Sequence, residues 1–452
     1  MSADTTGFLA ATAGIETITD RALVRQRSRD FFWYSPVLKE QLNRLSAEAV
    51  LVPRDEAEVL RVLAAARAHG VPVTPRGAGT GNYGQCVPLE GGIVLDLTAM
   101  TTIHELRDGV VEADPGVRLI DLDSWARDRG WELRLWPSTK RTATLGGFIC
   151  GGGAGVGGLA HGTMRERGNL CSVRVATLQD PPQMLDLAGD AAAPVNRAYG
   201  TNGVVTRIRL PLTPAQDWRD VAIAFDDLAA AGRFGLALMH ADGIPKKMCA
   251  MMDTMLPPFF KGLADSVPAG KALALCAVAP SALVALGDLV REHRGAVVAE
   301  QDMVAAERDP DATPFYEYCW NHTTLQVLKR DKGVTYLQCR FPFEDPLRAV
   351  EAVRARFGDE VWLHLECNRF GGRIALTALP VIRWTNEARL REIMEGFEEE
   401  GAAIANPHVV TVEDGSAYRR VDADQLGFKR LTDPLGLLNP GKLRSFRESA
   451  PA

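Results

Sequence analysis

Two histidines in the second half of the chain stand among polar and aromatic side chains that could surround a small molecule. His322 lies in the run YEYCWNHTTLQVLK, and His364 lies in LHLECN. A histidine titrates near neutrality, so it can take a proton from a substrate at physiological pH. The neighbours of His322 are Tyr316, Tyr318, Trp320 and Asn321. This run predicts either a pocket wall with His322 as a general base or an aromatic core cluster with a capping asparagine.

Two segments with strict alternation supply the other candidates. Tyr336, Gln338 and Arg340 share one face of TYLQCRF, and His364, Glu366 and Asn368 share one face of LHLECN. Alternation of this kind is typical of half-buried strands. The polar faces are either solvated, as is common in antiparallel sheets, or they line an active site. The candidate catalytic set is therefore His322, His364, Tyr336, Arg340 and Glu366, with His322 ranked ahead of His364 as the base and with Tyr336 and Arg340 orienting the substrate.

Two glycine-rich segments in the first half predict a site for a phosphorylated cofactor. In TPRGAGTGNYGQ, the residues Gly77, Gly79 and Gly81 can adopt positive φ and turn successive N–H groups inward, and Thr80 adds a hydroxyl. No Lys-Ser/Thr pair follows, so this is not a Walker A loop. The second segment, GGFICGGGAGVGG at 146–158, lies about 65 residues further on. Two such segments suit a pyrophosphate held from two sides.

The second segment contains a GxGxxG pattern at Gly153, Gly155 and Gly158, but its context is not that of a Rossmann fold. RTATLGG precedes the pattern instead of an apolar strand, and LAHGTMRERGN after it has no helical apolar stripe. A flexible hinge is also disfavoured, because each glycine costs about 0.5–1 kcal/mol relative to alanine. A backbone that approaches a ligand closely explains these glycines better.

Composition and periodicity indicate an α+β protein with two or three domains. The chain has 452 residues, a net charge of -6 and no long run of Lys or Arg, which argues against a nucleic-acid partner. Its eight cysteines form no CxxC pair, which argues against an iron–sulfur cluster or structural zinc. The N-terminus lacks the features of a signal peptide, and no stretch has the ~18 apolar residues of a membrane span. We therefore expect a cytoplasmic protein.

Hydrophobic periodicity places the elements along the chain. Residues 1–45 are expected to be helical. Strands such as AVLVP, VPVTPRG and GVVTRIRLPL then alternate with helices such as RDEAEVLRVLAAARAHG up to about residue 214. From 215 to about 405, helices such as DPLRAVEAVRARFG alternate with strands such as VWLHLEC, and the remaining tail is rich in turns.

Five segments, in this order, resemble the vanillyl-alcohol-oxidase or PCMH-type flavoproteins, and among these the glycolate oxidase GlcD subunit-like branch. They are PRGAGTG…VPLEGGIVLDLTAM (75–100), EADPGV (112–117), WPSTKRTATLGGFICGGGAGVGGLAHG (136–162), YGTNGVVTRIRLPL (199–212) and DPLGLLNPGKL (433–443). The resemblance covers about 50–215 and 428–445 well and is thin in between.

The resemblance implies a two-part PCMH-type FAD-binding domain and an antiparallel-sheet cap with helices that lies over the isoalloxazine. The implied division is an N-terminal helical segment (1–45), the FAD-binding domain (46–214), the cap or substrate domain (215–410) and a C-terminal segment that returns to the FAD domain (411–452). The implied FAD contacts are Pro75, Arg76, Gly77, Ala78, Gly79, Thr80, Gly81, Asn82, Pro137, Thr144, Gly146, Gly147, Gly153, His161, Gly203 and Val205.

Three departures from the family pattern refine this expectation. The first glycine loop has no histidine, which favours non-covalent FAD. Phe148 stands where many relatives have asparagine. The H-x-G-D-G-N metal motif is missing, and the comparable strand reads WLHLECNRFGG, so we expect no metal and keep the substrate open between alcohols and hydroxy acids.

The implied activity is oxidation of a C–OH group, with hydride transfer to flavin N5 and a protein base that takes the hydroxyl proton. Two alternatives are an ether-forming flavoenzyme of the alkylglycerone-phosphate-synthase kind and an FAD subunit of an electron-transfer complex. Expected partners are a small-molecule substrate and an electron acceptor, which is oxygen, quinone, cytochrome or another flavoprotein. A homodimer is among the expected assemblies.

Overall fold

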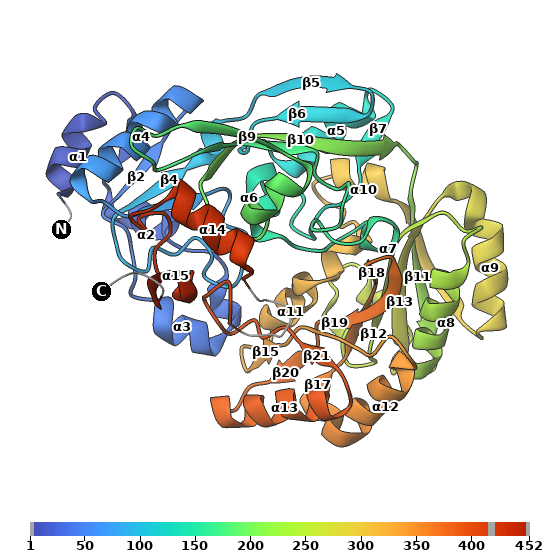
Figure 1. Ribbon diagram of the computed structural model, residues 1–452. Helices are drawn as coiled ribbons and strands as arrows, with labels where there is room; N and C mark the ends of the chain where they lie inside the picture. The colour runs from blue at the N-terminus through green and yellow to red at the C-terminus, as the bar shows by residue number, and fades with distance from the viewer. Residues whose placement is uncertain (1–3, 415–420, 449–452) are drawn as a thin grey trace.

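The computed structural model describes residues 4–414 and 421–448, and its elements form two groups (Figure 1). The first group begins with a four-stranded sheet of order β1-β2-β4-β3. Its strands are β1 (Glu16–Ile18), β2 (Ala49–Val52), β3 (Val73–Arg76) and β4 (Ile93–Asp96). β1 pairs antiparallel with β2, and the other pairs are parallel. Helix α4 (Glu56–His69) connects β2 to β3; it begins at Asp55, which accepts from the Glu58 N–H, and ends at Gly70 with φ 64°.

A second sheet completes the first group. Its order is β5-β6-β10-β8-β9, and β7 pairs with the end of β10. The strands are β5 (Ile103–Arg107), β6 (Val110–Ala113), β7 (Trp131–Leu133), β8 (Ser172–Ala176), β9 (Met184–Ala188) and β10 (Val204–Pro214). Helices α5 (Leu119–Arg127), α6 (Leu145–Gly151) and α7 (Gly158–His161) belong to the connections of this sheet.

The second group, which we call the cap, contains an eight-stranded antiparallel sheet of order β14-β11-β13-β12-β18-β19-β16-β21. The strands are β11 (Arg219–Phe225), β12 (Lys246–Met252), β13 (Ala272–Val278), β14 (Ala296–Asp302), β16 (Cys339–Arg340), β18 (His364–Phe370), β19 (Arg373–Ala378) and β21 (Ala403–Ile404). A small sheet of β15 (Val334–Tyr336), β20 (Val381–Arg383) and β17 (Val361–Trp362) lies beside it.

Both faces of the cap sheet are covered. On β12, Cys249 and Met251 belong to the apolar core shared with the cap helices, whereas Met248 and Ala250 belong to the core shared with the first group. The covering helices are α8 (Leu228–His240), α9 (Leu283–Glu292), α12 (Pro346–Phe357) and α13 (Glu387–Glu399). Helices α10 (Met303–Arg308) and α11 (Asn321–Leu328) lie between the sheet and the first group (Figure 1).

Two sequence expectations differ from the fold. TYLQCRF is not one strand, because β15 ends at Tyr336 and β16 begins at Cys339 in a different sheet. The chain crosses between the sheets at Leu337, whose N–H donates to the carbonyl of Pro380. Residues before 46 hold not only α1 (Thr5–Ala11), α2 (Arg21–Arg27) and α3 (Pro36–Leu42) but also strand β1, which extends the first sheet.

The C-terminal segment contacts the first group. Helix α14 (Ala423–Thr432) precedes a stretch that runs beside β3, where the Val73 N–H donates to Leu437 and the Asn439 N–H donates back to Val73. Helix α15 (Arg444–Glu448) follows. Within the described ranges, no helix combines the length and apolar character needed to cross a membrane.

Candidate active site

The loop after β3 and helix α6 face each other across a cavity of about 110 Å³. The chain segments that line it are far apart in sequence. Of the predicted cofactor contacts, those around this cavity are Pro75, Arg76, Gly77, Ala78, Gly79, Thr80, Gly81, Thr144, Gly146, Gly147, Gly203 and Val205. Lining residues that the sequence did not single out include Asp30, Gln85, Pro115 and Tyr199.

Close approach of the two segments requires their glycines. A Cβ on Gly77 would collide with the Thr144 side chain, and one on Gly146 would lie 2.5 Å from the Pro115 Cβ. Gly79 has φ 67°, as expected, and a Cβ there would also meet the Arg76 guanidinium. The expectation of positive φ at Gly77 and Gly81 is wrong; at Gly77 the requirement is space beside Thr144.

Buried polar groups hold the first loop from below. Arg76 donates to the Arg29 carbonyl over 2.6 Å and to the Ala78 carbonyl over 3.1 Å. Asp30 accepts from the N–H groups of Phe32 and Gln85, and burial raises the pKa of this carboxyl to about 6.

The C-terminal motif supplies further support for this loop. Asn439 donates to the carbonyls of Gln85 (2.8 Å) and Tyr199 (2.6 Å), and Lys442 donates to that of Gly84 (2.5 Å). All three carbonyls belong to segments at the cavity, so the specific motif at 433–443 fixes the loop in place.

The GxGxxG pattern has no Rossmann geometry. Helix α6 ends at Gly152 with φ 61°, and no strand precedes the pattern. A Cβ on Gly155 would collide with the Trp136 carbonyl, and one on Gly158 with the Asn368 side chain. These two glycines are therefore required by packing against protein atoms, whereas Gly153 lines a second cavity.

The second cavity, of about 630 Å³, lies between the first group and the cap. It continues from the first, because both are lined by Thr80, Gly81, Gln85, Gly147 and Gly151. Asn82, Pro137 and Phe148 line it from the first group. Polar side chains from the cap include Asn321, His322, Gln338, Arg340, Asn368 and Thr377.

His322 lies in the first turn of α11 and lines this cavity. Burial lowers the pKa of the His322 imidazole to about 4, while a hydrogen bond to the Glu317 main-chain carbonyl acts in the opposite direction. The ring is therefore neutral at pH 7. A neutral imidazole has one protonated nitrogen and one nitrogen that can accept a proton.

Arg340 is the second predicted catalytic residue at the cavity. Its guanidinium lies 4.1 Å from the centre of the Phe343 ring, and it donates to the Phe341 carbonyl over 3.4 Å. Its cross-strand neighbours in the cap sheet are Thr377 on β19 and Ala403 on β21, which also line the cavity.

The structure does not bring His364, Glu366 or Tyr336 to the cavity lining. All three are fully buried, so the solvated interpretation of the LHLECN face is wrong as well. His364 Nε2 lies 2.7 Å from Glu366 Oε1, and the Tyr336 ring packs edge-on against Tyr34. His161, a predicted cofactor contact, ends α7 and lines neither cavity.

Trp320, one of the predicted neighbours of His322, lines the second cavity, and its backbone conformation had no signal in the sequence. Its backbone has φ 50° and ψ -139°, a conformation that costs a non-glycine residue about 1–3 kcal/mol. Glu366 Oε1 accepts its N–H over 2.8 Å and holds this conformation. The buried Glu366 thus fixes the start of α11, where His322 lies.

Comparison with known proteins decides which cofactor these cavities suit. Residues 47–180 match the FAD binding domain family. The chain is 26% identical to the glycolate oxidase subunit GlcD of Bacillus subtilis (strain 168) over 429 residues, 88% of each chain. Residues 47–180 therefore carry an FAD binding domain, and the chain as a whole is similar to GlcD subunits of the PCMH-type flavoproteins.

Two further proteins are similar to this chain. A D-lactate dehydrogenase of Archaeoglobus fulgidus is 39% identical over 118 residues, 26% of each chain. A solved alkyldihydroxyacetonephosphate synthase superposes with a TM-score of 0.73 at 14% identity, covering 96% of this chain and 84% of that one. At this identity the structural likeness shows the fold alone.

The residues at the first cavity fit the pyrophosphate of FAD. Two glycine segments bring main-chain atoms to the cavity, and Asp30, the only carboxylate among the described residues that line it, already accepts two N–H groups. Below the loop, the buried Thr74 Oγ1 and Arg76 Nε have no hydrogen-bond partner among the described residues. Across residues 4–414 and 421–448, no three His, Cys, Asp or Glu side chains gather as a metal ion would need.

Proposed function

We propose that this PCMH-type protein is an FAD-dependent oxidoreductase that oxidises the CH–OH group of a small alcohol or hydroxy acid, with His322 as the general base. One observation carries this proposal: a neutral imidazole from the cap lines the second cavity, which continues into the first cavity. We call the first cavity, where the pyrophosphate of FAD would bind, the FAD cradle. When bound, FAD supplies the acceptor for the hydride.

The residues of this chain would hold FAD and remove the substrate proton. The glycine loop, Thr144, Gly147 and the segment at Gly203 would hold FAD without a covalent link. The free nitrogen of His322 would take the hydroxyl proton, which favours oxidation at the adjacent carbon. Burial keeps this nitrogen unprotonated down to about pH 4.

Arg340 on β16 and Gln338, which immediately precedes β16, would orient the substrate. The named activities of the relatives, glycolate oxidase and D-lactate dehydrogenase, make a 2-hydroxy acid the first class to test. An arginine at the cavity can bind the carboxylate of such an acid through charge-assisted hydrogen bonds. His364 and Glu366 would not contact the substrate; they would support the backbone conformation of Trp320. Tyr336 would contribute only packing, against Tyr34.

An anaerobic screen tests this function. The yellow protein is mixed with 2-hydroxy acids, primary alcohols and aryl carbinols, and bleaching is followed at about 450 nm. We expect at least one class to bleach the flavin, and acid to release FAD into solution. Readmission of air then separates an oxidase from an enzyme that needs another acceptor. Flavin that no class bleaches, or turnover without net oxidation of substrate, would contradict the proposal.

A further inference from the structure

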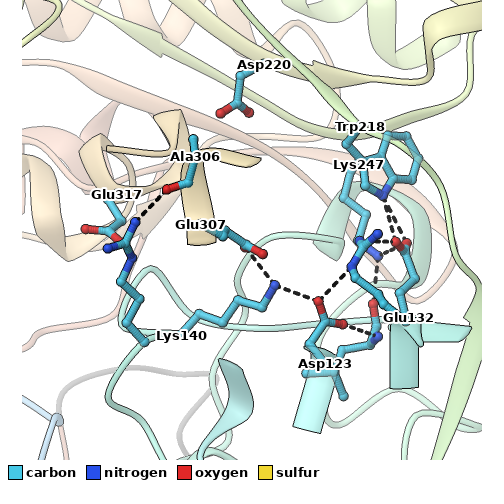
Figure 2. Close-up of polar contacts among 12 residues, drawn as sticks. Asp123, Glu132, Lys140, Trp218, Asp220, Lys247, Ala306, Glu307 and Glu317 are labelled. Atoms are coloured by element: carbon cyan, nitrogen blue, oxygen red, sulfur yellow. Dashed lines mark hydrogen bonds and ion pairs between the residues drawn. The ribbon is translucent and has the colours of Figure 1, made fainter. Parts of the chain in front are cut away.

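A buried ion-pair network joins the two groups beneath one wall of the second cavity (Figure 2). Residues Pro137, Ser138, Thr139, Thr142 and Ala143 form that wall. Lys140 and Arg141, in the middle of this segment, do not line the cavity. Their side chains instead contact Glu307 and Glu317 of the second group.

Lys140 bridges the two groups. Its Nζ is fully buried and lies 2.8 Å from Asp123 Oδ2 on α5 and 2.7 Å from Glu307 Oε1 on α10. The pKa of Asp123 is lowered to about 2, because attraction to Lys140 and Arg127 outweighs the effect of burial. Attraction to Asp123 and Glu307 likewise raises the pKa of the Lys140 ammonium despite its burial, so Lys140 and Asp123 are both charged at neutral pH.

Arg141 continues the connection toward the proposed base. Its Nε lies 2.8 Å from Glu317 Oε1, and its NH2 donates to the carbonyls of Ala306 and Ala312 over 2.9 and 3.1 Å. Glu317 lies in the short helical turn Phe315–Tyr318, which contacts α11, where His322 lies. The Arg141–Glu317 ion pair thus links the wall to the segment that leads into α11 and His322.

Aromatic packing closes the space around these charges. The Lys140 ammonium lies 4.0 Å from the centre of the Trp136 ring, and Tyr316 packs edge-on against that ring at 6.2 Å. Excluding water in this way strengthens the ion pairs and penalises any movement that would separate them.

We propose that Lys140 and Arg141 are positioning residues for His322. They fix the separation between the wall at 137–143 and the segment from Glu317 to α11, and so place the imidazole at a set distance from the FAD cradle. The proposal rests on the proposed function only in giving His322 the role of base.

The chain offers a matched control in a second ion pair between the same groups. Lys247 on β12 is also buried, with its Nζ 2.7 Å from Glu132 Oε1 and from the Leu133 carbonyl. It too lies over the Trp136 ring, at 4.5 Å. Neither Lys247 nor Glu132 lines the cavity, and Figure 2 shows this pair apart from Glu317.

The test compares Lys140→Met, Arg141→Met and Lys247→Met in the FAD-loaded protein. We expect the two wall variants to slow the limiting rate of flavin reduction by 10- to 100-fold, on the order expected for a small misplacement of a catalytic group. Their FAD dissociation constants should stay within about threefold of wild type. The reduction rate of Lys247→Met should stay within about threefold of wild type, even if this variant loses as much in melting temperature as the two wall variants do. Arg141→Lys, which keeps the charge toward Glu317, should recover part of the rate.

Hydrogen exchange gives a second readout that needs no substrate. Amides of Asn321–Leu328 should exchange at least about tenfold faster in the wall variants, but not in Lys247→Met. If no substrate is found for the wild type, the proposed function fails while this readout still tests the positioning role. If Lys140→Met does not fold, the partly exposed Arg141 carries the comparison. Equal loosening of α11 in all three variants, or none in the wall variants, would overturn the inference.

Discussion

At the scale of single residues, Gly79 shows most plainly how backbone geometry builds the cofactor site. Its φ of 67° is unfavourable for any residue with a branched side chain, and a Cβ would meet the guanidinium that holds the loop. Sequence spacing predicted the loop and this glycine. It could not distinguish positive φ at Gly79 from simple close approach at Gly77, because both produce the same residue type.

Replacing Gly79 with valine should therefore abolish FAD binding. A suitable control is Gly270→Val, since Gly270 also has positive φ, at 74°, but no atom lies within 4 Å of its Cβ position. Both variants suffer backbone strain of about 1–2 kcal/mol, so only loss of the cradle separates them. FAD content after purification and the dissociation constant of added FAD measure the difference. Normal FAD occupancy in Gly79→Val would mean that the cradle lies elsewhere.

At the scale of elements, the cap strands show where sequence patterns stop being informative. Alternating polar residues predicted a half-buried β18, but His364, Glu366 and Asn368 are all buried. Periodicity reports which residues share a face, and it cannot report that α11 and the first group cover that face. The contact between Lys140 and Glu307, separated by 167 residues, likewise has no local signal.

Asp220 on β11 is another acidic residue buried on the cap sheet, and it predicts a pH-dependent stability. Burial raises the pKa of its carboxyl from 3.8 to about 7, although the Phe315 N–H and Gln301 donate to it. The folded state therefore holds a proton that the unfolded state releases above pH 4. Stability is full below about pH 4, falls as pH rises toward about 7, and is level above that.

Asp220→Asn should remove this penalty. The variant should raise the free energy of unfolding at pH 8 by up to about 4 kcal/mol, the equivalent of three pKa units, and should have little effect at pH 4. Urea unfolding of the FAD-loaded protein at the two pH values measures the difference. The same change at both pH values would show that the carboxyl is not protonated in the fold.

At the scale of the whole molecule, the account depends on two groups of elements meeting at one cavity. The motifs at 75–100, 136–162 and 199–212 predicted most of the residues that line the first cavity, and the motif at 433–443 supports its loop, because phosphate binding constrains local sequence strongly. The cap side was predicted only in part: His322 and Arg340 reach the cavity, and His364, Glu366 and Tyr336 do not. Which polar residues face a ligand depends on how distant segments pack, and a single sequence does not record that.

The most direct test of the central claim is the anaerobic rate of flavin reduction in His322→Asn at saturating substrate. The account predicts a rate ~10²–10⁴-fold below wild type, the usual effect of losing a general base, with FAD content unchanged. His364→Asn, the control, should reduce at close to the wild-type rate, and the wild-type rate should fall only as the pH drops toward about 4, where His322 gains a proton. Reduction of His322→Asn within about threefold of wild type, with His364→Asn slow instead, would contradict the account.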